Sequence, residues 1–130
     1  MFDRIEVAAG VVKDAQGRIL ICRRKGALEG LWEFPGGKIE EGETPFEAII
    51  REIREELSAE IEPSGIFCEY PFSYPEKEIY FYFIRAKLLS EKIEPTFHSE
   101  IKWLFPSEAE NLEFCPADIS AAEKIKGEYK

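Results

Sequence analysis

Three glutamates, Glu52, Glu55 and Glu56, stand at positions i, i+3 and i+4 in a segment that is otherwise rich in isoleucine. At 100° per residue these side chains share one stripe of a helix. Grouped carboxylate oxygens are suitable ligands for Mg²⁺, which takes one or two carboxylates together with phosphate oxygens and water. The spacing therefore indicates a divalent-cation site that could serve chemistry on phosphates.

A solvated helix surface is the competing interpretation of these glutamates. Charge runs on helices are usually solvated faces, and Lys38, Arg51 and Arg54 could simply neutralise this one. The three glutamates alone favour this second interpretation, so the residues around them have to decide.

The surrounding residues resemble the Nudix signature. Gly37, Glu43 and the run from Arg51 to Glu56 match six of its seven fixed residue types at the right spacing. Ser58 stands in place of the second glycine, and Ala59 in place of the following larger aliphatic residue. The glycine lies where the helix ends, so we expect a slightly altered helix exit and intact chemistry.

The resemblance implies a metal-dependent hydrolase that uses Mg²⁺, with Mn²⁺ as a substitute. It implies Glu52, Glu55, Glu56 and the carbonyl of Gly37 as metal ligands. Either Glu52 or Glu55 would be the general base, and Arg51 would hold a glutamate through a bidentate pair.

A further metal ligand of the family departs from its pattern in this chain. Many relatives carry a glutamate six residues before the tryptophan that matches Trp103, and here that position is Phe97. Glu100, or else Glu94, is the expected substitute. A plain surface carboxylate is an equally good interpretation of Glu100.

The resemblance extends to the MutT branch, which hydrolyses damaged nucleotides. The matching residues are Arg23-Arg24, the stretch from Leu31 to Thr44, and the stretch from Phe114 to Asp118. It implies substrate contacts by a set of five residues: Arg24, Phe34, Gly36, Lys38 and Asp118. The alternatives are a core position for Phe34, a solvated Arg24, and an N-cap role for Asp118.

Asp118 bears on the choice of base, because the branch prototype has Asn at this position. An ionised Asp only accepts hydrogen bonds, whereas Asn donates and accepts. Asp118 therefore suits a base edge that presents hydrogen-bond donors. Oxidised purine triphosphates and cytidine triphosphates both remain candidate substrates.

The expected reaction is hydrolysis of a nucleoside triphosphate to the monophosphate and pyrophosphate. A Nudix hydrolase of nucleotide sugars or dinucleotides is the first alternative. A non-catalytic binding module of the same fold is the second, although such modules usually lack part of the glutamate cluster that is complete here.

Apolar periodicity predicts the elements that position these residues. A hairpin is expected from Glu6–Val12 and Arg18–Cys22, and a short strand at Trp32–Phe34. A helix over Pro45–Ser58 is expected to begin with a capping box between Thr44 and Glu47 and to have an apolar face of Phe46, Ile49, Ile50, Ile53 and Leu57. The remaining expected elements are strands at Ile66–Tyr74, Ile79–Leu89 and Glu100–Phe105, and helices at Pro106–Leu112 and Ala117–Gly127. Together they indicate one domain over residues 1–130 in the α/β class, a Nudix-type α/β/α sandwich with a mixed sheet.

Composition excludes several other classes of protein. The chain has 130 residues and a net charge of −9, which argues against a nucleic-acid polymer as partner. The longest apolar runs fall short of the ~18 residues of a membrane span, and the N-terminus does not resemble a signal peptide. We therefore expect a cytoplasmic enzyme for a small nucleotide, as a monomer or a homodimer. Cys22, Cys68 and Cys115 are expected to be free thiols, His98 an exposed loop residue, and Tyr80, Phe81, Tyr82 and Trp103 core residues.

Overall fold

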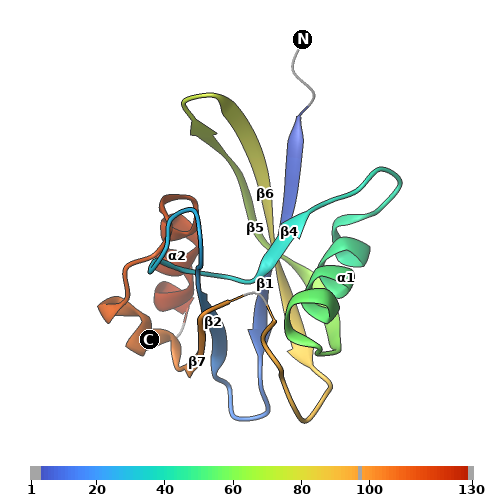
Figure 1. Cartoon of the computed structure of the whole chain (residues 1–130). Helices are drawn as coiled ribbons and strands as arrows, with labels where there is room; N and C mark the ends of the chain where they lie inside the picture. The colour runs from blue at the N-terminus through green and yellow to red at the C-terminus, as the bar shows by residue number, and fades with distance from the viewer. Residues whose placement is uncertain (1–3, 97, 129–130) are drawn as a thin grey trace.

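The computed structural model describes residues 4–96 and 98–128, and within them seven strands form one mixed sheet. The strands are β1 (Ile5–Lys13), β2 (Ile19–Arg23), β3 (Trp32–Glu33), β4 (Gly36–Lys38), β5 (Ile61–Tyr74), β6 (Lys77–Leu88) and β7 (Glu100–Leu104). Their order is β3-β2-β1-β6-β5, with β4 also paired to β1 and β7 to β2. Helices α1 (Pro45–Leu57) and α2 (Ile119–Glu128) cover opposite sides of the sheet (Figure 1). The expected α/β/α sandwich is confirmed.

Two apolar clusters hold the layers together, one on each face of the sheet. Because successive strand residues point to opposite faces, Ala8 and Val12 of β1 pack with α1, whereas Ala9 and Val11 pack with α2. Each helix is therefore fixed on its own face of the sheet by one of the two clusters.

Helix α1 begins with the expected capping box. Thr44 Oγ1 accepts a hydrogen bond from the Glu47 amide at 3.1 Å, and Glu47 Oε1 accepts one from the Thr44 amide at 2.9 Å. Ile49, Ile53 and Leu57 are fully buried against the sheet. Phe46 belongs to the predicted apolar face, but it is 38% exposed and lies outside both clusters. A residue on the apolar stripe is buried only where another element covers it.

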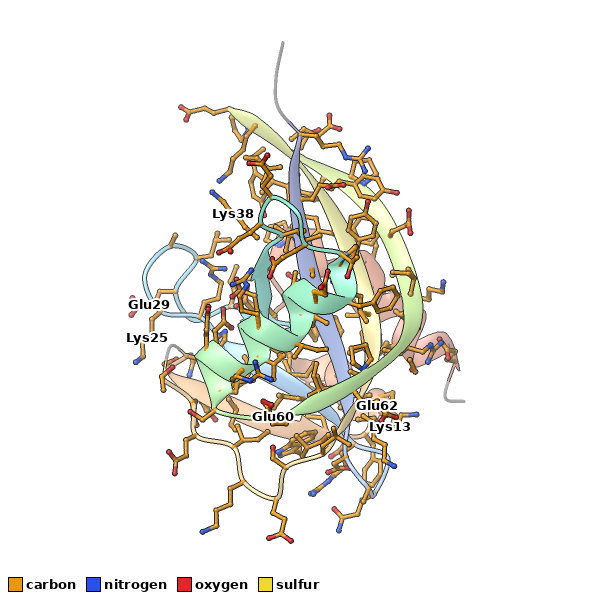
Figure 2. The ribbon with its side chains drawn as sticks, turned by 90° about the vertical axis from the view of Figure 1, so that its right-hand side faces the viewer. Lys13, Lys25, Glu29, Lys38, Glu60 and Glu62 are labelled. Atoms are coloured by element: carbon orange, nitrogen blue, oxygen red, sulfur yellow. The ribbon has the colours of Figure 1, made fainter. Side chains whose placement is uncertain are left out.

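Strand β4 is an element that the sequence did not predict. Gly36 and Gly37 pair with Ala9 and Ala8 of β1 in antiparallel register. A Cβ atom on Gly36 would lie 2.0 Å from the Ala8 carbonyl oxygen, so only glycine permits this approach. The strand carries Gly37 and Lys38 to the start of the loop that leads into α1 (Figure 2).

The start of β5 differs from expectation because tertiary pairing overrides local signals, and the helical segments after β7 also differ. Strand β5 begins at Ile61, and irregularities in the pairing with β6, between Pro63 and Gly65 and between Ile66 and Cys68, accommodate the residues that would otherwise break a strand. The segment Pro106–Asn111 is a 3₁₀ helix. Residues Pro116–Asp118 form a short 3₁₀ turn ahead of α2.

Ser58 ends α1 in the left-handed conformation, with φ of 52° and ψ of 36°. The altered helix exit that we expected is therefore not seen, because Ser58 adopts the backbone shape that glycine favours. A non-glycine residue in this conformation costs about 1 kcal/mol.

We predict that Ser58→Gly raises the free energy of unfolding by about 0.5–1 kcal/mol. Glycine removes the Cβ strain, but its greater conformational entropy in the unfolded chain offsets part of this stabilisation. Urea denaturation of the purified protein measures the change. Ser58→Ala is the matched control and should give no increase, since alanine keeps the Cβ atom. Equal stabilisation by both variants would contradict the explanation.

Candidate active site

The guanidinium of Arg51 binds three acidic side chains and a backbone carbonyl. It binds Glu43 through two parallel hydrogen bonds, Nε to Oε2 at 2.8 Å and Nη2 to Oε1 at 2.9 Å. Nη1 donates to Glu52 Oε1 at 2.8 Å and to Glu55 Oε2 at 3.3 Å, and Nη2 donates to the Lys38 carbonyl at 2.9 Å. The bidentate pair expected of Arg51 is thus formed with Glu43. This pairing lowers the pKa of Glu43 to about 2.

Glu52 is held against the backbone of Gly37. A Cβ atom at position 37 would lie 2.5 Å from the carboxyl group of Glu52. Glycine at this position therefore lets the Glu52 carboxylate lie directly beside the β4 backbone. The side chain of Glu52 is 14% exposed, whereas that of Glu55 is 58% exposed.

Of the three stripe glutamates, Glu56 has the environment that most disfavours the ionised carboxylate. Its Oε2 atom is buried and has no hydrogen-bond partner among the described residues. Burial, followed by the nearby charges of Glu52 and Glu33, raises the pKa of Glu56 to about 8. A buried carboxylate oxygen without a donor, beside a second carboxylate, fits a bound divalent cation, which would supply the missing positive charge. Glu52 and Glu56 are therefore the residues best placed to hold it, whereas Glu55 lies at the exposed edge of the stripe.

A loop closes over the C-terminal end of α1, beside these glutamates. Thr96 Oγ1 donates to the backbone carbonyls of Glu55 and Glu56 at 3.0 and 3.1 Å. The Thr96 amide also donates to the Glu56 backbone carbonyl, at 2.8 Å. The Glu94 amide donates to the Leu57 carbonyl. These bonds satisfy helix-end carbonyls that would otherwise lack partners.

A second polar group lies at the margin formed by β3 and the turn before α2. Carboxylate oxygens of Glu33 and Asp118 and the Cys115 sulfur all lie within 4.8 Å of one another. Arg24 Nη1 donates to Glu33 Oε1 at 2.9 Å, and Asp118 Oδ1 accepts from the Phe34 amide at 3.3 Å. Burial, together with the charge of Glu33, raises the pKa of Asp118 well above its usual range, so its neutral form is favoured.

Tyr70 fixes the backbone around Asp118. Its hydroxyl donates to the Ala117 carbonyl at 2.5 Å and accepts from the Ala121 amide at 3.3 Å. The tyrosine lies on β5, so the central sheet determines where the turn before α2 places the Asp118 carboxyl group. Asp118 and Arg24, far apart in the sequence, are brought to the same polar group by this packing.

The expected exposed position of His98 is wrong. Its side chain is fully buried, and Nε2 lies 2.9 Å from Glu33 Oε2 and 4.0 Å from Glu56 Oε2. The loop that is anchored on α1 carries the imidazole ring inward. A histidine thus stands between the two acidic groups of the site.

The other predicted site residues differ in burial and in their distance from the two acidic groups. The Phe34 ring is 3% exposed and packs on Phe83 and Phe114, so its side chain belongs to the core and its amide faces Asp118. Glu100 lies on β7, where Oε1 is 3.4 Å from Arg23 Nη1, and a metal role for it stays a prediction. Lys38 is exposed, and Phe97 lies outside the described residues.

Glu33 and His98 are the residues that sequence reasoning missed. The alternation of Trp32, Glu33 and Phe34 was the signal that could have identified Glu33. In a strand, a charged residue between two buried aromatic residues points to the opposite face of the sheet. Nothing in the sequence marks His98, because only the path of its loop brings it to Glu33.

Comparison with protein families matches the NUDIX domain over residues 3–125. The chain is 33% identical to an 8-oxo-dGTP diphosphatase of Haemophilus influenzae, with 95% of this chain and 93% of that protein covered. It is 31% identical to the CTP pyrophosphohydrolase of Escherichia coli, with 92% and 89% covered. Among solved structures, the Escherichia coli ORF135 protein superimposes with a TM-score of 0.87 at 29% identity, and 97% of this chain and 91% of that one are covered.

We predict that Glu56 makes the metal-free protein less stable as the pH rises. A carboxyl group whose pKa is about 8 when folded and about 4.5 when unfolded favours unfolding increasingly between these two pH values. Thermal unfolding in EDTA should therefore show a falling Tm from pH 5 to pH 8, equivalent to a few kcal/mol, which Glu56→Gln largely removes.

Added Mg²⁺ should restore the Tm of the parent protein at pH 8 and have little effect on Glu56→Gln. The matched control is Glu41→Gln, since Glu41 is an exposed glutamate outside the signature. Parallel pH curves for the parent protein and Glu56→Gln would show that Glu56 is not the source of the effect.

Proposed function

The chain belongs to the Nudix hydrolase family, and from this membership we propose that it is a Mg²⁺-dependent nucleoside triphosphate pyrophosphohydrolase. Nudix hydrolases generally use a divalent metal ion. The products of the proposed reaction are the nucleoside monophosphate and pyrophosphate. The observation that carries the proposal is the complete set of signature glutamates, of which Arg51 binds three, with the buried oxygen of Glu56, which has no hydrogen-bond partner among the described residues, next to them.

The proposed roles follow from exposure and hydrogen bonding. Glu52, Glu56 and the Gly37 carbonyl would hold the cation, which when bound neutralises phosphate charge and lowers the pKa of a coordinated water. Glu55 is the most exposed of the three stripe glutamates and has only a 3.3 Å contact with Arg51, so it is free to accept the proton of the attacking water. Arg51 keeps these carboxylates together although they repel one another.

The nucleobase is proposed to bind near Arg24, Glu33 and Asp118. The two relatives with named substrates act on 8-oxo-dGTP and on CTP, which supports a triphosphate with a hydrogen-bonding base edge. The raised pKa of Asp118 revises the argument from sequence, because a neutral carboxyl group donates as well as accepts. Both classes of base therefore stay in the proposal.

A substrate panel tests this function directly. Pyrophosphate release with Mg²⁺ is measured for ordinary nucleoside triphosphates, for 8-oxo-dGTP, and for nucleotide sugars as the competing class. Preference for 8-oxo-dGTP or a cytidine triphosphate is the expected result. Hydrolysis of nucleotide sugars alone would overturn the proposal.

No helix among the described residues is long and apolar enough to cross a membrane. We propose a cytoplasmic location with a small nucleotide as the partner.

We predict that Glu55→Gln lowers kcat by at least about 100-fold, because an amide cannot accept the proton of the attacking water. Steady-state pyrophosphate release with the best substrate of the panel measures the effect. Glu41→Gln, an exposed change outside the cluster, should stay within about twofold of the parent protein. Turnover of Glu55→Gln close to that of the parent protein would remove Glu55 from the mechanism.

We predict that Asp118→Asn changes the ratio of kcat/KM between 8-oxo-dGTP and CTP by at least about tenfold. The amide always presents two donor hydrogens, whereas the carboxyl group presents one at most, and a lost base-reading hydrogen bond costs a large factor in discrimination. Glu123→Gln on the exposed side of α2 is the control. An unchanged ratio would show that Asp118 does not read the base.

A further inference from the structure

His98 lies between two acidic groups that the proposed reaction uses for different tasks. Its Nε2 atom is 2.9 Å from Glu33 Oε2, beside Asp118, and 4.0 Å from Glu56 Oε2, beside Glu52. The imidazole side chain is fully buried. One side chain therefore faces both the acids proposed for base binding and the acids proposed for metal binding.

The two oxygens of Glu33 each have a nitrogen partner, one of them on His98. Arg24 donates from Nη1 to Oε1, and its Nε donates to the Ala27 carbonyl at 2.8 Å, so Arg24 ties the loop before β3 to the same carboxylate. His98 contacts Oε2 at 2.9 Å. With both oxygens held, the Glu33 carboxylate keeps one orientation toward Asp118 and Cys115.

The backbone on either side of His98 is hydrogen-bonded to other elements of the fold. The Thr96 amide donates to the Glu56 carbonyl at 2.8 Å, and the Ser99 amide donates to the Arg23 carbonyl at 3.1 Å. Thr96 is therefore tied to the end of α1, and Ser99 to the end of β2.

Packing alone does not account for a histidine here. Burying a polar ring costs free energy unless its nitrogens are engaged, and an aliphatic residue would fill the space without that cost. A buried polar side chain that has acids of both groups as neighbours therefore indicates more than a packing role.

We propose that His98 is a positioning residue that couples the nucleobase pocket to the metal-binding glutamates. It holds Glu33 in the orientation that reads the base, and the same buried ring lies 4.0 Å from Glu56 Oε2, so a change at the ring would also reach this glutamate. The proposal rests on the proposed function for the meaning of the two groups, and it adds the physical link between them.

Binding measurements without turnover test the base-pocket half. CMP and 8-oxo-dGMP are titrated in EDTA against the parent protein, His98→Leu, His98→Gln and His98→Asn. His98→Leu should weaken the better monophosphate by about tenfold and change the ratio of the two Kd values. His98→Gln should restore binding, since its amide nitrogen reaches the place of Nε2, and His98→Asn should not, since its amide is too short.

Metal binding without nucleotide tests the other half. Calorimetric titration with Mn²⁺ should show at least threefold weaker binding in His98→Leu, and Glu91→Gln, an exposed change on the same loop, should match the parent protein. Because the chain contains one histidine, its ring ¹⁵N signals are unambiguous in NMR spectra. Adding CMP and adding Mg²⁺ should each shift them, and Glu33→Gln should abolish only the response to CMP.

The outcomes separate the coupling from a structural role and from the proposed function. A lower Tm for His98→Leu, with both affinities of the folded protein unchanged, would overturn the coupling. Equal behaviour of His98→Gln and His98→Asn would also overturn it. If the parent protein hydrolyses no triphosphate, the proposed function fails, but the monophosphate and Mn²⁺ titrations still decide the role of His98.

Discussion

The pairing of Arg51 with its surrounding carboxylates is the interaction on which the site depends. Four glutamates of the signature lie together, and at neutral pH their mutual repulsion would separate them or force them to take up protons. The guanidinium has five donors in a fixed plane and engages Glu43, Glu52, Glu55 and the Lys38 carbonyl at once. It thereby joins β4, the following loop and α1 into one rigid unit. Glu56 lies beyond its reach and keeps the unsatisfied oxygen that a cation would satisfy.

The rest of the fold supplies rigid supports for this unit. The capping box starts α1 at a defined residue, the apolar face of the helix fixes its rotation on the sheet, and the loop through Thr96 closes its far end. On the other side of the sheet, Tyr70 holds the turn that carries Asp118. The groups proposed for metal binding and for base reading thus lie in different layers of the sandwich, and Glu33 and His98 lie between them.

Particular elements show why prediction succeeded in some places and failed in others. Helix α1 was predicted to within one residue because its cap, apolar period and glutamate stripe are all local. The start of β5 was missed because Pro63 and Gly65 suggest a break, whereas pairing with β6 absorbs them as irregularities. Strand β4 was missed because its pairing with β1 gives no local signal, and Phe46 was misplaced because the helical period does not say which turn is covered.

The sequence by itself determined the family resemblance, the α/β class, the glutamate cluster with its bidentate arginine, and the residues from which a base pocket could be built. These features depend on spacing along the chain, and helix geometry converts spacing directly into position. Tertiary structure alone decided that Phe34 lies in the core, that Asp118 lies buried beside Glu33, and that His98 points inward between two acidic groups. Burial and the pKa values that follow from it depend on which distant segments cover a side chain, and the local residue pattern does not contain that information.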